Sequence, residues 1–191
     1  DEGRLGLATE AMIRPWKKLN STILSDHRIF KVRRDRVINP RTNAEHEMVV
    51  LENPEWVNIC ALTPNNELVM VEQYRQGSET VELEIPGGLV DEGESPLESG
   101  LRELREETGY EGENARIIGS LFANPAIMNN QVHTVLVENC VQKHELEWDE
   151  GEDILVRLVP VADIPGLIGT GKIRHSIIVA ALQLFALERG D

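Results

Sequence analysis

Residues 87–110 read GGLVDEGESPLESGLRELREETGY, a pair of glycines that leads into a short acidic helix. Ser95 is a good N-cap, Pro96 suits the first helical position, and Glu98 completes a capping box three residues after Ser95. Gly109 supplies the left-handed residue that ends many helices. The stretch therefore predicts a helix over residues 95–108, around which the rest of the chain is organised.

The predicted helix has an apolar face and an acidic edge. Leu97, Leu101 and Leu104 recur at helical spacing, so we expect them to face the core. A solvated acidic face or a site for a divalent cation would each explain the acidic edge, because Mg²⁺ and Mn²⁺ prefer carboxylate oxygens. The edge consists of three glutamates whose like charges repel each other at spacing i, i+3 and i+4: Glu103, Glu106 and Glu107.

The whole stretch resembles the signature of the Nudix hydrolases, G-x5-E-x7-R-E-U-x-E-E-x-G-U, in which U is a bulky aliphatic residue. Every fixed glycine and charged residue of that signature is present. The one departure is an aromatic residue in the last aliphatic slot, which is a packing position. The matching residues are Gly88, Glu94, Arg102, Glu103, Leu104, Glu106, Glu107, Gly109 and Tyr110.

Composition limits the classes of protein that fit. The chain has 191 residues, enough for one domain with a small appendage, and 41% hydrophobic residues allow a sizeable core. A net charge of −14 argues against nucleic acid or an anionic membrane as a partner. Cys60 and Cys140 form no CxxC motif, so we expect buried thiols and a cytoplasmic protein. The longest apolar run, residues 177–187, is interrupted by Gln183 and too short to span a bilayer.

We expect three parts along the chain. Residues 1–11 are interpreted as a loose terminus or an expression remnant and receive no function. Residues 12–55 contain alternating runs at 21–24, 28–34 and 47–51, which predict a small antiparallel β unit. Such a unit buries too little to be stable alone, so it should pack on another surface. Residues 56–191 are expected to form the main domain.

The pattern of the main domain predicts an α/β fold. Its strands dominate the middle and its helices stand apart, so we expect a mixed sheet between helices. The resemblance implies the same Nudix α/β/α sandwich. The expected strands are residues 56–62, 67–75, 81–85, 115–121, 132–141 and 154–160, the further helices are 161–168 and 176–188, and residues 145–153 are an acidic loop.

The resemblance implies a site for Mg²⁺, or for Mn²⁺. Arg102 neutralises the acidic edge and takes a catalytic part by orienting the ligand carboxylates. Glu94 braces the loop or reaches the metal through water. The paired glycines let a main-chain carbonyl approach a ligand closely. The implied metal ligands are Gly87 through its carbonyl, Glu103, Glu106 and Glu107.

Such a site supports attack of water on a diphosphate, since the cation neutralises phosphoryl oxygens and lowers the pKa of a bound water. The family cleaves nucleoside diphosphates that are joined to a further group. In relatives that act on ADP-ribose, the general base is a glutamate on a flexible loop after the signature. Glu150 and Glu152 are the candidates, and we favour Glu150 because the residues from Gly151 onward resemble that subfamily. Either residue could instead belong to a solvated acidic loop.

Segments outside the signature resemble the ADP-ribose and nucleotide-sugar pyrophosphatases. Pro125 follows Tyr110 by fifteen residues, where those enzymes carry a proline, and residues 72–75 and 82–88 are also similar to theirs. Arg75 is expected to contact a phosphate, or to form a surface ion pair with Glu72 or Glu84. Glu84 could hydrogen-bond a ribose hydroxyl.

Three aromatic residues are candidates for stacking on a base, although aromatic residues make up only 4% of the chain and packing also needs them. They are Trp16, Phe30 and Tyr74. In the resembled subfamily the N-terminal strands exchange between two subunits, so we expect a homodimer with exchanged strands.

The sequence therefore predicts a Mg²⁺-dependent pyrophosphatase that splits ADP-ribose or a related nucleotide sugar into a nucleoside monophosphate and a sugar phosphate. One alternative is a Nudix hydrolase that acts on dinucleoside polyphosphates or a coenzyme. A second is a non-catalytic Nudix-fold sensor of nucleotide sugars, although such modules usually lose the glutamates retained here. A third, an acidic cation-binding interaction module, leaves the Gly87-Gly88 pair and Arg102 unexplained.

Overall fold

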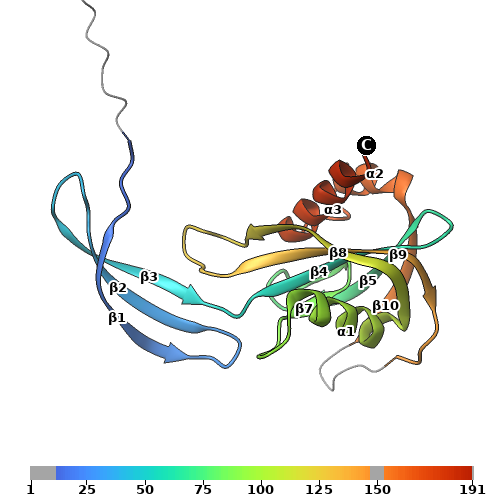
Figure 1. Ribbon diagram of the computed structural model, residues 1–191, viewed down its shortest axis with the longest axis horizontal. Coiled ribbons are helices and arrows are strands. Elements are labelled where there is room, and N and C mark those ends of the chain that lie inside the picture. The colour runs from blue at the N-terminus through green and yellow to red at the C-terminus, as the bar shows by residue number, and fades with distance from the viewer. Residues whose placement is uncertain (1–11, 147–152, 191) are drawn as a thin grey trace, which may run out of the picture. The chain divides into compact units, whose positions relative to one another are not determined.

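The computed structural model describes residues 12–146 and 153–190 (Figure 1). The chain divides into two compact units, Asp1–Glu52 and Asn53–Asp191, and each is treated by itself. Within the described residues, no helix is long and apolar enough to cross a membrane.

The first unit is a three-stranded antiparallel sheet of β1 (Lys17–Asp26), β2 (Lys31–Ile38) and β3 (Glu45–Glu52), in that order. The predicted alternating runs at 21–24 and 47–51 lie within β1 and β3, whereas β2 begins at Lys31 and the run at 28–34 begins in a turn, where Arg28 has a φ of 68°. Of the described residues of this unit, only Asp35 and Val37 are buried. Several apolar side chains are consequently exposed: Leu19, Ile23, Leu24, Ile29, Met48 and Val49.

The second unit is built on a seven-stranded mixed sheet with the order β10-β5-β4-β9-β8, in which β6 pairs with β5 and β7 pairs with β4. β4 and β9 are parallel, and every other pair is antiparallel. The predicted α/β class and mixed sheet are confirmed. The strands are β4 (Trp56–Leu62), β5 (Glu67–Arg75), β6 (Thr80–Glu84), β7 (Gly87–Leu89), β8 (Tyr110–Phe122), β9 (Gln131–Gln142) and β10 (Ile154–Pro160).

Helices cover both sides of this sheet, and each side has its own core (Figure 1). α1 (Pro96–Thr108) packs through Leu104 against Val57 and Ile59 of β4. α3 (Ser176–Arg189) packs through Ile178 and Phe185 on the other face, together with Cys60 of β4. Alternate residues of β4 therefore point to opposite helices. The predicted helix over residues 161–168 is a short 3-10 turn, η1 (Val161–Asp163), followed by α2 (Ile164–Gly169).

The α1 helix begins and ends as its sequence predicts. Ser95 and Glu98 form a capping box, and Gly109 adopts the left-handed conformation with a φ of 71°. The prediction for Leu101 is wrong, since this side chain is 38% exposed. Gly100 takes the central position of the buried face, because a Cβ there would lie 3.1 Å from Val57. Because Gly100 is the residue of α1 that lies against β4, Leu101 lies at the exposed edge of the buried helix face.

Both cysteines are free, buried thiols, as predicted. Burial raises the pKa of Cys60 and of Cys140 to about 12, so neither is a thiolate at neutral pH. These side chains behave as small apolar core residues.

Candidate active site

A cavity of about 530 Å³ opens where two strands of the sheet separate. β4 and β5 pair only at their hairpin end, through Ala61↔Val69 and Leu62↔Leu68. Beyond that point β6 continues the pairing of β5, β7 continues that of β4, and Pro86 connects them. The diverging strands place the N-terminal end of α3 and the acidic edge of α1 on the wall of one cavity.

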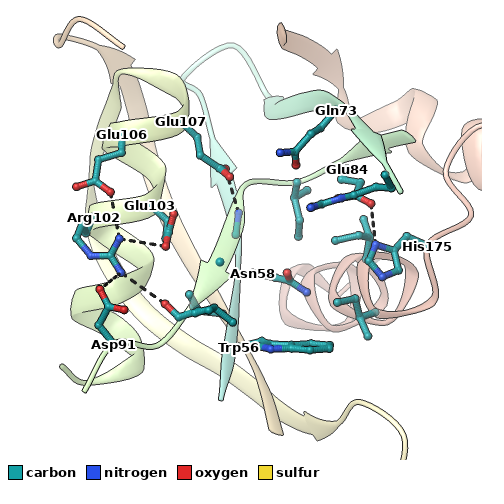
Figure 2. A pocket seen from close by; sticks show the side chains of 18 residues that line it. Trp56, Asn58, Gln73, Glu84, Asp91, Arg102, Glu103, Glu106, Glu107 and His175 are labelled. Carbon is teal, nitrogen blue, oxygen red and sulfur yellow. Dashed lines mark hydrogen bonds and ion pairs between the residues drawn. The ribbon is translucent and has the colours of Figure 1, made fainter. Parts of the chain in front are cut away.

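The side of the cavity next to α1 is termed the acidic lobe and consists of Asp91, Glu103, Glu106 and Glu107. Figure 2 shows Arg102 between the carboxylates of this lobe. Its guanidinium group lies 3.0 Å from Glu103, 3.1 Å from Glu106 and 3.2 Å from Asp91. Partial burial would lower the pKa of Arg102, but these neighbouring carboxylates raise it, so the group stays a cation.

Glu94 lies behind Arg102 and braces the start of α1. It accepts hydrogen bonds from Ser99 Oγ at 2.6 Å and from Arg102 Nε at 3.2 Å. The bond from Ser99, followed by Arg102, lowers the pKa of Glu94. Bracing the loop was the first of the two roles expected for this residue.

The two glycines of β7 face different neighbours. A Cβ on Gly88 would collide with the carboxylate of Glu103, so that carboxylate lies directly against Gly88. A Cβ on Gly87 would collide with the backbone carbonyl of Val57. The Gly87 N–H donates a hydrogen bond to Glu107 Oε2 at 3.1 Å. Glu103 and Glu107 of α1 therefore both contact β7.

The acidic lobe has the donor chemistry of a site for Mg²⁺ or Mn²⁺. Glu103 and Glu107 point their oxygen atoms at β7 from adjacent turns of α1, and Glu106 lies beside them (Figure 2). Across the described parts of the chain, no three acidic, histidine or cysteine side chains are arranged around one point. Arg102 contacts Glu103 and Glu106 in this arrangement. Carboxylate oxygens are the ligands that a hard cation prefers, so the residues fit Mg²⁺ or Mn²⁺. Glu103 and Glu106, which contact Arg102, would have to turn toward the cation to bind it.

The side of the cavity next to α3 is termed the α3-side lobe and consists of Trp56, Asn58, Gln73, Arg75 and His175. The carboxylate of Glu84, whose side chain is 1% exposed, holds two of these residues. Arg75 donates to Glu84 Oε2 at 2.6 Å, and His175 Nδ1 lies 2.7 Å from Glu84 Oε1. Burial would raise the pKa of Glu84, but hydrogen bonds from His175 and Arg75 lower it, so the carboxylate is ionised.

A second ion pair fixes the same end of α3. Arg174 donates to both carboxylate oxygens of Glu82, with the closest contact at 3.0 Å. Hydrogen bonds from Arg174 and then Thr80 lower the pKa of Glu82 to about 2. β6 therefore binds two consecutive residues before α3, through Glu82 and Glu84, and so holds the end of α3 at the cavity.

The structure brings most of the predicted site residues together. The acidic lobe, Arg102, Gly87 and Arg75 line one cavity, and Glu84 contributes to its wall. Arg75 forms the predicted ion pair with Glu84 while its side chain remains 42% exposed to the cavity. Glu84 has little surface for direct contact with a ribose, which stays a prediction, whereas its observed contacts position Arg75 and His175.

Other predicted site residues lie elsewhere. Pro125 is exposed in a turn after Asn124 and does not line the cavity. Trp16 belongs to the first unit, where its ring lies 5.4 Å from that of His46. Glu150 and Glu152 lie outside the described residues.

Four residues of the α3-side lobe were not predicted: Trp56, Asn58, Gln73 and His175. One signal for Asn58 was available, because it is the single polar residue in the strand sequence WVNICAL. No comparable signal marks His175, whose position depends on a contact with Glu84 that is 91 residues away in the chain.

Comparisons with known proteins identify relatives of this chain. A model of the NUDIX domain matches residues 52–182. The ADP-ribose pyrophosphatase of Bacillus subtilis (strain 168) is 31% identical over 140 residues, which cover 73% of this chain and 76% of that protein. The methanol dehydrogenase activator of Bacillus methanolicus is 32% identical over 175 residues, which cover 90% of this chain and 93% of that protein.

A solved structure has the same fold. The crystal structure of an ADP compounds hydrolase superposes with a TM-score of 0.82 and covers 94% of this chain and 98% of that one. The sequence identity is 24%, so this likeness concerns the fold alone.

Proposed function

Because this chain belongs to the family of Nudix hydrolases, we propose that it hydrolyses the diphosphate bond of ADP-ribose or of a related nucleoside diphosphate sugar. The products are a nucleoside monophosphate and a sugar phosphate. The observation that supports this substrate class is one cavity in which the acidic lobe faces Arg75. Two proteins named ADP-ribose pyrophosphatase, from Bacillus subtilis and Mycobacterium tuberculosis, are 31% and 30% identical to this chain.

We propose Mg²⁺ as the cofactor, with Mn²⁺ as a substitute. Glu103, Glu106, Glu107 and the carbonyl of Gly87 would hold the cation. When bound, it supplies neutralisation of the phosphoryl oxygens and a lowered pKa for a bound water. Arg102 pairs with Glu103 and Glu106, which reduces the repulsion between these neighbouring carboxylates.

The hydrolysis needs one water molecule and one base. The water oxygen forms a bond to one phosphorus, the bond from that phosphorus to the bridging oxygen breaks, and the departing phosphate carries the electron pair away. Glu150 or Glu152 takes the proton from the water in this proposal. Arg75, held by Glu84, binds a phosphate oxygen and so aligns the diphosphate.

The remaining predicted contacts are part of the proposal. Trp16 stacks on the base, and Pro125 shapes the loop between β8 and β9. The buried free thiols of Cys60 and Cys140 support a reducing, cytoplasmic compartment.

A substrate panel tests the proposed function. The purified protein is incubated with Mg²⁺ and, separately, with ADP-ribose, other nucleotide sugars, dinucleoside polyphosphates and coenzymes that contain a diphosphate. We expect a nucleoside monophosphate and a sugar phosphate from the nucleotide sugars, and no reaction in the presence of a chelator. Preferential cleavage of a dinucleoside polyphosphate or a coenzyme would instead support the alternative Nudix activity, and binding without cleavage would support the sensor.

The glycines of β7 give the first prediction. Gly88→Ala should lower turnover with little loss of stability, because the added methyl group displaces only the flexible carboxylate of Glu103. Gly87→Ala should destabilise the fold by roughly 1–3 kcal/mol, because its methyl group meets the backbone of Val57. Thermal melting and steady-state kinetics on both variants measure the contrast. Equal losses of stability would contradict it.

We further propose a homodimer formed through the first unit, with exchanged N-terminal strands. Among the described residues of that sheet only Asp35 and Val37 are buried, while apolar side chains beside them stay exposed, as with Ile23 at 49% and Met48 at 40%. A three-stranded sheet without a core normally needs another surface to cover it.

Ile23 provides the second prediction. Ile23→Lys should raise the dissociation constant of the dimer by about tenfold or more, because a charge would enter an apolar contact. Thr22→Lys is the matched control, since Thr22 is the adjacent residue of β1 and points to the other face of the sheet. Light scattering across a concentration series measures both. A wild-type protein that is monomeric and fully active would contradict the dimer.

A further inference from the structure

The α3-side lobe contains a buried amide group that lacks a protein partner. Asn58 is 5% exposed, and its Nδ2 has no hydrogen-bond partner in the described structure. Folded proteins rarely leave a buried donor unpaired, since it has lost its water without gaining a substitute. On the same face of β4, Cys60 packs into the apolar core. An amide at this position is therefore an unfavourable choice for packing alone.

The Asn58 side chain lines the cavity on the α3 side of β7, as Figure 2 shows. Trp56 precedes it by two residues on the same face of β4, so the indole ring and the amide are neighbours. Gln73 of β5 and His175 at the start of α3 complete the polar wall. An amide that lines a cavity and has no protein partner for its donor is suited to bind a ligand there.

The charge balance of the lobe favours an uncharged ligand group. Arg75 is the single cation among the described residues that form this lobe, and Glu84 balances it. His175 Nδ1 donates a hydrogen bond to the same carboxylate, so Nε2 is the ring nitrogen that can contact a ligand. The lobe therefore presents neutral hydrogen-bond donors and acceptors around the indole ring of Trp56. It lacks the excess positive charge that would bind a phosphate in addition to the diphosphate.

Building on the proposed function, we propose that the α3-side lobe binds the sugar of the nucleotide-sugar substrate. The carboxamide group of Asn58 hydrogen-bonds to one sugar oxygen, His175 Nε2 bonds to a hydroxyl group, and Trp56 packs against the ring. A sugar offers hydroxyl groups on several sides, which matches carboxamide and imidazole groups from three different elements. A nucleobase has polar groups only at its edge and needs flat apolar contacts on its faces. Asn58 and His175 are therefore specificity residues for the group attached to the diphosphate.

Two substrate series separate the sugar from the base. The first keeps ADP constant and varies the sugar, as in ADP-ribose, ADP-glucose and ADP-mannose. The second keeps glucose constant and varies the base, as in ADP-, GDP- and UDP-glucose. The ratios of kcat/KM within each series are measured for the wild type, for Asn58→Leu and for Gln183→Leu. Gln183 is the matched control because its amide is exposed on α3 outside the cavity.

We expect Asn58→Leu to lower kcat/KM for the preferred sugar by roughly 10- to 100-fold. The differences in kcat/KM among the ADP-sugars should become smaller. The order of the bases should not change. Without substrate, the melting temperature of Asn58→Leu should equal or exceed that of the wild type, because an unpaired amide is replaced by an apolar group. A structural role for Asn58 predicts the opposite, a lower melting temperature with unchanged sugar ratios.

His175→Asn is the second variant, since the shorter amide can still donate to Glu84 but has no group in place of Nε2. It should show the same loss of sugar preference as Asn58→Leu. If the wild type cleaves nucleotide sugars while both variants keep its sugar ratios, or change only its base ratios, the sugar subsite is overturned and the proposed function stands. If the wild type cleaves none of the nucleotide sugars, the proposed function fails, and the subsite fails with it.

Discussion

Glu107→Gln is expected to lower kcat by at least about 100-fold, because a metal site contributes several kcal/mol of transition-state stabilisation and each 1.36 kcal/mol is tenfold in rate. The substitution keeps the shape of the side chain and removes one negative charge. The amide oxygen can still accept the hydrogen bond from the Gly87 N–H, which Glu107 Oε2 accepts at 3.1 Å in the structure. The fold should survive, and its melting temperature should not fall.

Glu98→Gln is the matched control for this experiment. Glu98 lies on the same helix but serves the capping box, where its carboxylate accepts from the Ser95 N–H at 2.8 Å and where glutamine is an accepted substitute. Steady-state kinetics over a titration of Mg²⁺ should separate the two variants, with only Glu107→Gln losing turnover at saturating metal. Unchanged turnover in Glu107→Gln would refute the assignment of the metal ligands.

The second large effect is expected in the acidic loop. Replacing the general base by glutamine should lower kcat by about 10²–10⁴-fold, because the amide cannot take the proton of the attacking water. Glu150→Gln and Glu152→Gln, measured side by side, identify which residue is the base, and we expect Glu150→Gln to show the loss. Its rate should also lose the rise with pH that ionisation of the base produces.

Glu145→Gln serves as the control for the loop, because Glu145 is an exposed acidic residue that precedes the two candidates. It changes the net charge by the same amount without touching either candidate. Wild-type rates in both Glu150→Gln and Glu152→Gln would remove this loop from the mechanism and require a base from another part of the chain.

The local part of the structure could be predicted from the sequence. Ser95, Glu98 and Gly109 act on the backbone within a few residues, so the bounds of α1 follow from them. The predicted strands at residues 56–62, 67–75 and 154–160 match the bounds of β4, β5 and β10 as well. Leu101 shows the limit of this reasoning, since helical spacing alone does not reveal that Gly100 brings the helix against Val57.

The α3-side lobe could not be predicted, because it depends on the separation of β4 from β5. Nothing local in the sequence shows that these strands pair at only two positions or that β7 joins β4. The contact of His175 with Glu84 follows from that arrangement. The three glutamates of the acidic lobe could be predicted because one helix carries them, whereas the α3-side lobe combines residues of β4, β5 and the segment before α3.

The division of the cavity by β7 has an evolutionary consequence. The residues proposed to hold the cation lie on α1 and β7, and those proposed for sugar selection lie on β4 and directly before α3. A duplicated gene can therefore acquire a new leaving group through a few substitutions in one set while the other is inherited unchanged. Paralogues that share the helical signature but differ at the positions of Trp56, Asn58 and His175 are the natural place to look for such divergence.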